Sequence, residues 1–228
     1  MKKWIVFFLI VAALLVGANS YAPTLAEAGL YAALSSKFGL HNNDIHVQAS
    51  PGAKIFLGDM DAVTLHAENI KVGDLKFSQF DCNLYDVTFD PLAALLDHKV
   101  QLNHAQSGEM TASVRSDELE KFLAENIQGL DHPQVSFEND AVRVAGDLSI
   151  GGLLSAHADV RGHFGMQGHK LMFIPSDVSI EGLGVKYNAK NLASAEIYDF
   201  SKFPLGIQPD SVTMRDGVLT IHGQVSNS

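Results

Sequence analysis

Residues 141–165, which read AVRVAGDLSIGGLLSAHADVRGHFG, decide the fold of this chain. Apolar side chains recur at even-numbered positions, whereas the odd positions carry polar residues such as Arg143 and Asp147. A glycine pair at 151–152 interrupts the pattern, which resumes and continues to Phe164. A period of two with one apolar face is typical of antiparallel strands that cover a core on one side. The segment therefore predicts two neighbouring strands joined by a turn.

The same period of two occurs along most of the chain on either side of this segment. Short alternating runs lie at residues 63–67, 75–77, 85–89, 100–102, 110–114, 135–137, 171–173, 178–180 and 219–225. Arg215-Asp216-Gly217 has the composition of a tight turn and predicts a final hairpin. The sequence thus predicts about ten amphipathic strands.

Three stretches predict helices instead. The first spans Tyr21 to Gly39, where Thr24 and Glu27 have the spacing of a capping box and Gly39 is placed to end the helix. The second begins at Ser116 as N-cap and stops near Gly129. The third is a weaker, alanine-rich helix from Asn188 to Tyr198.

So many one-sided strands and so few helices predict an α+β fold with a large, strongly curved antiparallel sheet wrapped on a few helices. A flat sheet would expose more apolar surface than three short helices can cover, so the sheet must curl. A curled sheet around a helix can leave an elongated apolar cavity, which suits acyl chains because they need no hydrogen-bond partners. We expect one domain over residues 21–228, with two structural halves as the alternative.

The N-terminus has the pattern of an export segment. Lys2 and Lys3 precede an unbroken apolar run over residues 4–16, and small residues follow up to Ser20. Residues 1–20 are therefore expected to be a signal peptide or an N-terminal membrane anchor. Either alternative predicts an extracytoplasmic protein, secreted or held on the outer face of the cytoplasmic membrane.

Composition limits the classes of partner. The 228 residues include 16 Lys and Arg against 26 Asp and Glu, a formal net charge of −10, which argues against nucleic-acid binding. One cysteine, Cys82, excludes an internal disulfide, and its neighbours Asp81 and Asn83 provide no base, so we expect a buried, unreactive thiol.

Chemistry-bearing motifs are weak throughout the sequence. One face of a predicted strand carries His157, Asp159, Arg161 and His163. The two histidines are about 20 Å apart along an extended strand, and Arg161 lies between Asp159 and His163, so these side chains do not form a metal site. No G-x-S-x-G, H-E-x-x-H or Walker motif occurs. We therefore expect no enzyme activity, no metal site and no cofactor.

Several stretches, in order, resemble the LmeA-like phospholipid-binding proteins of the bacterial envelope. They are VQASPGAKIFLGDMD at 47–61, the strand ladder at 63–91, TASVRSDEL at 111–119, KLMFIPSDVSIEG at 170–182 and FPLGIQPDSVTMRDGVLTIHG at 203–223. The likeness covers about residues 44 to 225 and lies in strand lengths and turns rather than in a catalytic signature.

The resemblance implies a non-catalytic, extracytoplasmic protein that binds phospholipid, with or without transferring it, in an apolar groove of a fold similar to tubular lipid-binding domains. It further implies a part in maintaining envelope lipids or lipoglycans, with a phospholipid or related membrane lipid and the membrane surface as partners. The alternative is a structural or protein-interaction module of the envelope with a filled core and no ligand.

The candidate lipid-binding residues are apolar side chains on the predicted strands, on the second helix and in two turn-rich segments expected to form the mouth of the groove, at 166–168 and 200–207. They are Phe77, Phe89, Leu119, Phe122, Leu123, Ile127, Val144, Phe164, Met166, Phe173, Phe200, Phe203 and Leu205. Met166, Phe200, Phe203 and Leu205 are expected to be exposed and to dip into a membrane.

Overall fold

The computed structural model describes residues 2–72, 74–97, 102–138, 141–150, 154–182, 185–189, 194–202 and 207–225. The chain divides into two compact units, each described by itself. Unit 1 comprises Met1–Ala67, Asp81–Glu109 and Val225–Ser228, and unit 2 comprises Glu68–Phe80 and Met110–Gln224. The prediction of one domain over residues 21–228 concerns independent folding and stays a prediction.

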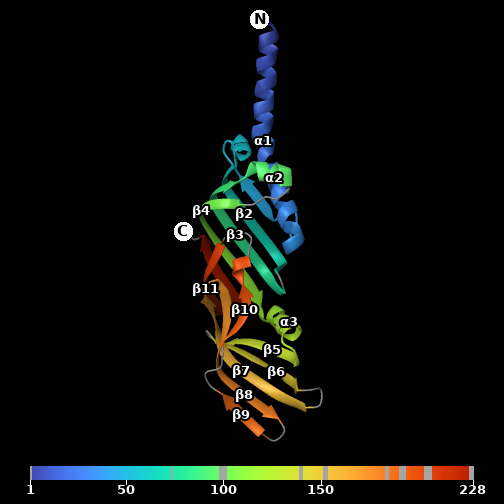
Figure 1. Ribbon diagram of the computed structural model, residues 1–228, viewed down its shortest axis with the longest axis vertical. Coiled ribbons are helices and arrows are strands. Elements are labelled where there is room, and N and C mark those ends of the chain that lie inside the picture. The colour runs from blue at the N-terminus through green and yellow to red at the C-terminus, as the bar shows by residue number, and fades with distance from the viewer. Residues whose placement is uncertain are drawn as a thin grey trace. The chain divides into compact units, whose positions relative to one another are not determined.

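The strands form two six-stranded sheets (Figure 1). The first has the order β1-β2-β3-β4-β12-β11, with bounds β1 Ile45–Gln48, β2 Asp59–Val72, β3 Leu75–Phe89, β4 Leu102–Arg115, β11 Ile207–Arg215 and β12 Val218–Val225. The second has the order β10-β8-β7-β6-β5, with β9 also paired to β8. Its bounds are β5 Leu130–Glu138, β6 Ala141–Ile150, β7 Leu154–Gln167, β8 Lys170–Gly182, β9 Val185–Ala189 and β10 Ala195–Asp199. The predicted α+β class, with curled antiparallel sheets and few helices, is confirmed.

The helices are α1 Lys2–Phe38, α2 Pro91–Asp97 and α3 Ser116–Asn126, with short 3₁₀ turns η1 Gly52–Leu57 and η2 Phe200–Lys202. The helix predicted from Ser116 is confirmed, although Arg115 takes the N-cap position. No sequence pattern indicated η1 or α2. Among the residues that the structure describes, no helix has both the length and the apolarity needed to cross a membrane.

Helix α1 begins earlier than the sequence predicted. It runs without a break through Thr24, so the capping-box interpretation is wrong. The Glu27 carboxylate instead accepts a hydrogen bond from the backbone N–H of Val47 at 2.9 Å, which ties α1 to β1. The predicted end of the helix is confirmed, since Gly39 has a φ of +68° and donates its N–H to the Ser35 carbonyl oxygen at 2.9 Å.

One contact fixes η1 against α1. Pro23 lies inside α1 and has no N–H, so it leaves the carbonyl oxygen of Asn19 without its helical donor. Gly52, at the start of η1, lies directly against this oxygen, and any Cβ at position 52 would collide with it. Only glycine therefore allows this close approach.

The helix predicted over Asn188–Tyr198 is wrong. Apart from Ser194, the described residues of this stretch belong to β9 and β10, which pair antiparallel with β8, with Ala189 opposite Val178 and Tyr198 opposite Leu171. Alanine is a good helix former, but intrinsic propensity amounts to less than about 1 kcal/mol per residue, and pairing with an available strand outweighs it.

The final hairpin turns where the sequence predicted. Asp216 and Gly217 have φ values of +51° and +76°, the pattern of a two-residue turn between β11 and β12. The expectation for Cys82 is also confirmed, because its side chain is buried in β3 and burial raises the pKa of its thiol to about 12.

Candidate functional site

The second sheet of unit 2 has two chemically different faces. In its antiparallel register Val144 of β6 lies opposite Val160 of β7, which in turn lies opposite Val178 of β8. One row along, Gly146, Ala158 and Ile180 are aligned in the same way. Because side chains alternate between faces, these rows form one continuous apolar face.

The opposite face carries cross-strand ion pairs. Arg143 of β6 makes a two-pronged hydrogen bond to the Asp159 carboxylate of β7, and this contact lowers the pKa of Asp159. Arg161 Nη2 lies 2.9 Å from Glu138 Oε2, and His157 Nδ1 lies 3.0 Å from Asp147 Oδ1. Among the described residues, no group of three histidine, cysteine or acidic side chains is arranged to hold a metal ion. This face is therefore a solvated surface that fixes strand register.

The apolar face lines a cavity of about 510 Å³ within unit 2. All of the lining residues are apolar or glycine: Leu123, Ile127, Leu130, Val144, Gly146, Leu148, Ala158, Val160, Phe164, Phe173, Pro175, Val178, Ile180, Ala195 and Ile197. None of these fifteen described residues has a side chain that forms hydrogen bonds, so the cavity favours an apolar occupant.

Helix α3 and its C-cap residue form one wall of this cavity through Leu123 and Ile127. Figure 1 shows α3 beside β5, and the Glu120 carboxylate on α3 accepts the backbone N–H of Val135 on β5 at 2.8 Å. Glu118, almost fully buried, pairs with Lys76 at 3.0 Å and holds the start of the helix to β3. These polar contacts set the distance between helix and sheet.

A pair of aromatic rings forms another part of the wall. Phe164 on β7 and Phe173 on β8 lie opposite each other, with ring centroids 5.6 Å apart. Ile127 keeps 44% of its surface exposed at the end of α3, so the cavity has an apolar edge that reaches solvent. An elongated hydrocarbon could therefore enter without passing polar groups.

Five of the candidate residues line this cavity, and the others lie elsewhere. Leu123, Ile127, Val144, Phe164 and Phe173 are lining residues. Leu119 is buried in the core of unit 2, Phe122 and Met166 are half-buried, and Phe77 packs edge-on against Tyr198 at 6.2 Å. Phe89 lies in unit 1, and Phe203 and Leu205 lie outside the described residues.

The expectation that Phe200 is exposed is wrong. Its side chain is only 2% exposed, and its ring packs against Tyr198 with centroids 4.7 Å apart. The surrounding turn residues suggested a surface position, but the 3₁₀ turn η2 directs this ring into unit 2. Phe200 is therefore not available for contact with a membrane.

Sequence reasoning also missed several lining residues. Leu148, Val160 and Ile180 belong to the same even-numbered apolar pattern that identified Val144, so the signal was present. Ala195 and Ile197 were missed because their segment was interpreted as a helix. Pro175 lies next to a register shift between β7 and β8, which no local pattern reveals.

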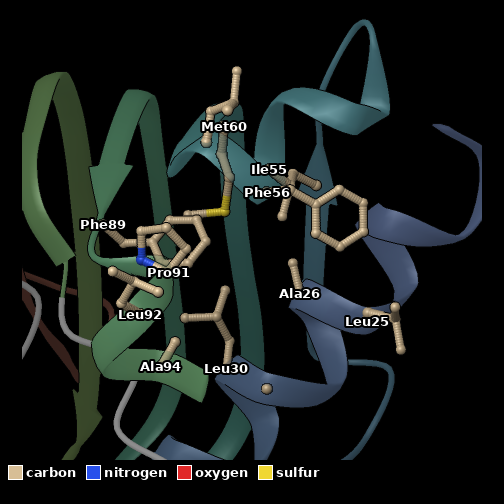
Figure 2. Close-up of a pocket in the computed structure, with 12 residues that line it drawn as sticks. Leu25, Ala26, Leu30, Ile55, Phe56, Met60, Phe89, Pro91, Leu92 and Ala94 are labelled. Carbon is tan, nitrogen blue, oxygen red and sulfur yellow. The ribbon is translucent and has the colours of Figure 1, made fainter. Parts of the chain in front are cut away.

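Unit 1 contains a separate apolar pocket of about 600 Å³ (Figure 2). It is formed by α1, η1 and α2 together with the ends of β2 and β3, and Figure 2 shows Leu30, Met60 and Phe89 around its centre. The full lining is Leu25, Ala26, Gly29, Leu30, Ile55, Phe56, Leu57, Met60, Phe89, Pro91, Leu92 and Ala94. Among the candidate lipid-binding residues that the structure describes, Phe89 alone lines this pocket.

Comparison with known proteins agrees with the apolar character of the site. No curated protein and no solved structure matches the chain. The family model described as LmeA-like phospholipid-binding matches residues 17–224, which is nearly the whole chain and includes every residue of both apolar cavities. The chain therefore belongs to the LmeA-like phospholipid-binding family.

Proposed function

We propose that this protein binds phospholipid by enclosing acyl hydrocarbon in the cavity of unit 2, without converting it chemically. The observation that carries the proposal is a cavity of about 510 Å³ whose fifteen lining residues are all apolar or glycine. Its volume lies within the range of roughly 300–1,000 Å³ that is usual for small-molecule sites. Membership of a phospholipid-binding family supplies the class of ligand.

Energetics support an acyl chain as the occupant. Each methylene transferred from water to an apolar site contributes about 0.8 kcal/mol, so a chain of ten buried methylenes contributes on the order of 8 kcal/mol before ordering costs. No lining side chain requires a hydrogen-bond partner, so acyl chains of different length and saturation bind by the same apolar contacts. The alternative of a structural module with a filled core is disfavoured by the open volume.

The biological setting is part of the proposal. The basic residues Lys2 and Lys3, followed by an apolar run, support export, with the folded part on the outer side of the cytoplasmic membrane. In that setting a carrier of acyl chains would support the upkeep, and by extension the transfer, of envelope lipids or lipoglycans.

Photocrosslinking tests the ligand and the site together. The full chain is incubated with a phospholipid whose acyl chain carries a photoactivatable diazirine, irradiated, and digested for peptide mapping. We expect crosslinks in β6, β7 and β8 at cavity-lining residues. A known lipid carrier, treated with the same photoactivatable phospholipid in parallel, is the positive control. If that carrier is crosslinked and unit 2 of this protein is not, the proposal is overturned.

A matched pair of variants separates the cavity from the rest of the protein. Val144 lines the cavity and Ala145 lies on the opposite face of β6, and both side chains are half-buried. Val144→Trp fills cavity space and is expected to reduce crosslinking severalfold, whereas Ala145→Trp should leave it unchanged. Equal crosslinking in the two folded variants would contradict the assignment of the lipid to the cavity of unit 2. Lipid bound by the N-terminal segment would crosslink equally in both variants, so it does not affect this comparison.

A further inference from the structure

The pocket of unit 1 has an exposed apolar rim. Leu25 on α1, Phe56 and Leu57 on η1, and Leu92 on α2 are 63%, 53%, 79% and 66% exposed, and all four line the pocket. Single exposed apolar residues are ordinary on protein surfaces, but a group gathered around one apolar pocket marks an interaction surface. We call these four residues the unit 1 rim.

The backbone beneath the unit 1 rim is held in place. Gly58 ends η1 with a φ of +92°, and a Cβ there would collide with the Phe89 carbonyl oxygen. The Phe89 N–H donates to the Gly58 carbonyl oxygen at 2.9 Å. The Asp90 carboxylate caps α2 by accepting the N–H groups of Leu92 and Ala93 at 2.9 and 3.0 Å. The rim is thus a preformed surface.

Some of the charge beside this surface is paired. Lys54 on η1 pairs with the Asp61 carboxylate, which also accepts the Ser50 N–H, and these contacts lower the pKa of Asp61. The Asp90 carboxylate is used in capping, and none of the twelve described lining residues is charged. The surface therefore offers shape and hydrocarbon rather than charge, which suits a neutral, oily partner.

Continuity along α1 identifies that partner. Residues 4–16 are apolar without interruption and belong to the same helix that carries Leu25 and Leu30. Val16 and Leu25 are nine residues apart, about 14 Å along the helix axis. Tyr21, 70% exposed between them, is of the residue type that concentrates at membrane–water interfaces. One continuous helix therefore joins a segment that seeks hydrocarbon to the pocket.

We infer that unit 1 rests on a phospholipid bilayer through the unit 1 rim, with acyl hydrocarbon of that bilayer occupying the pocket. In this arrangement Leu25, Phe56, Leu57 and Leu92 face the membrane surface. This membrane contact of unit 1 does not depend on whether the cavity of unit 2 binds lipid.

Site-directed fluorescence tests this inference on the full chain. Leu57→Cys and, as a matched control, Tyr85→Cys are labelled with the polarity-sensitive dye NBD and reconstituted in vesicles of phosphatidylcholine and phosphatidylglycerol at 3:1. Tyr85 is also an exposed apolar residue of unit 1, at 46%, but it does not line the pocket. Cys82 is buried with a thiol pKa of about 12, so it does not compete for the label.

The expected result is a shift of NBD emission to shorter wavelength at position 57, with loss of intensity when spin-labelled lipid is included. The dye at position 85 should keep the emission of a water-exposed dye. Adding Phe56→Asp to the Leu57→Cys chain should abolish the shift, because a carboxylate in the rim resists entry into hydrocarbon.

Two outcomes overturn the inference. One is emission at position 57 that matches position 85 in vesicles. The other is the same blue shift in detergent solution together with a dimer in analytical ultracentrifugation, which assigns the unit 1 rim to a second copy of the chain.

Discussion

Two apolar cavities in the described part of the chain are built in different ways. The cavity of unit 2 is lined mainly by strand residues that alternate on one face of a sheet, and its lining side chains are mostly buried or half-buried. The pocket of unit 1 is lined mainly by a long helix, two short helical segments and strand ends, and its rim is exposed (Figure 2). The first construction places apolar side chains along a sheet face, whereas the second leaves an apolar rim exposed to solvent.

The largest expected effect is the loss of stability when a side chain in the packed core of unit 2 is truncated, compared with one that lines the cavity. Leu119 is 1% exposed in the core, whereas Val144 already borders open space. We predict that Leu119→Ala lowers the free energy of unfolding by about 2–5 kcal/mol, while Val144→Ala lowers it by less than about 1.5 kcal/mol. Urea denaturation of lipid-free protein measures both, and equal losses would show that the cavity walls are as tightly packed as the core.

An intermediate effect tests how the pocket of unit 1 is held open. Gly52→Ala places a Cβ against the Asn19 carbonyl oxygen and should force η1 away from α1. We predict a loss of about 1–3 kcal/mol of stability from overpacking.

Gly17→Ala is the matched control for this change. A Cβ at position 17 meets no atom within 4 Å, and alanine favours helix, so stability should stay unchanged or rise by up to about 1 kcal/mol. Thermal unfolding followed by circular dichroism compares the two variants. A neutral Gly52→Ala would mean that η1 shifts without cost.

The smallest expected effect concerns the polar face behind the cavity. Hydrogen bonding to Arg143 lowers the pKa of Asp159 below its unfolded value. The pair therefore stabilises the fold fully above the unfolded pKa, and its contribution is lost as pH falls through the lowered folded pKa. We predict that Asp159→Asn removes this acid dependence, with an effect of less than about 1 kcal/mol at neutral pH.

Urea midpoints at several pH values between 2 and 7 measure this dependence for the parent and the variant. A difference between them that grows with acidity, instead of shrinking, would contradict the pairing. Because the pair lies on the face opposite the cavity, lipid crosslinking should be the same in both proteins.

The sequence predicted the sheet of unit 2 better than it predicted unit 1. Alternation over residues 141–165 placed β6 and β7 correctly and selected Val144 and Phe164 as candidate residues, and both line the cavity. Periodicity predicts these strands well because successive residues of a half-buried strand alternate between the apolar and the solvent-exposed face. The short elements η1 and α2 have no period long enough to detect, so the pocket they form was not expected.

The errors share one physical cause. Thr24 and Glu27 have the spacing of a cap, yet Glu27 bonds to Val47, a partner twenty residues away. The stretch 188–198 favours helix locally, yet its described residues pair with β8. In each case a contact distant in sequence outweighed a local preference of a few tenths of a kcal/mol per residue.

By itself, the sequence determined the α+β class, the strand ladder, the buried thiol of Cys82 and the family, because alternation, turn residues and their order are local properties of a chain. Only the tertiary structure decided which parts of the apolar faces pack against other side chains of the chain and which parts line a cavity. That distinction depends on the separation between α3 and its sheet, and between α1, η1 and α2, which contacts such as Glu120 to Val135 and Gly52 to Asn19 set across long stretches of sequence.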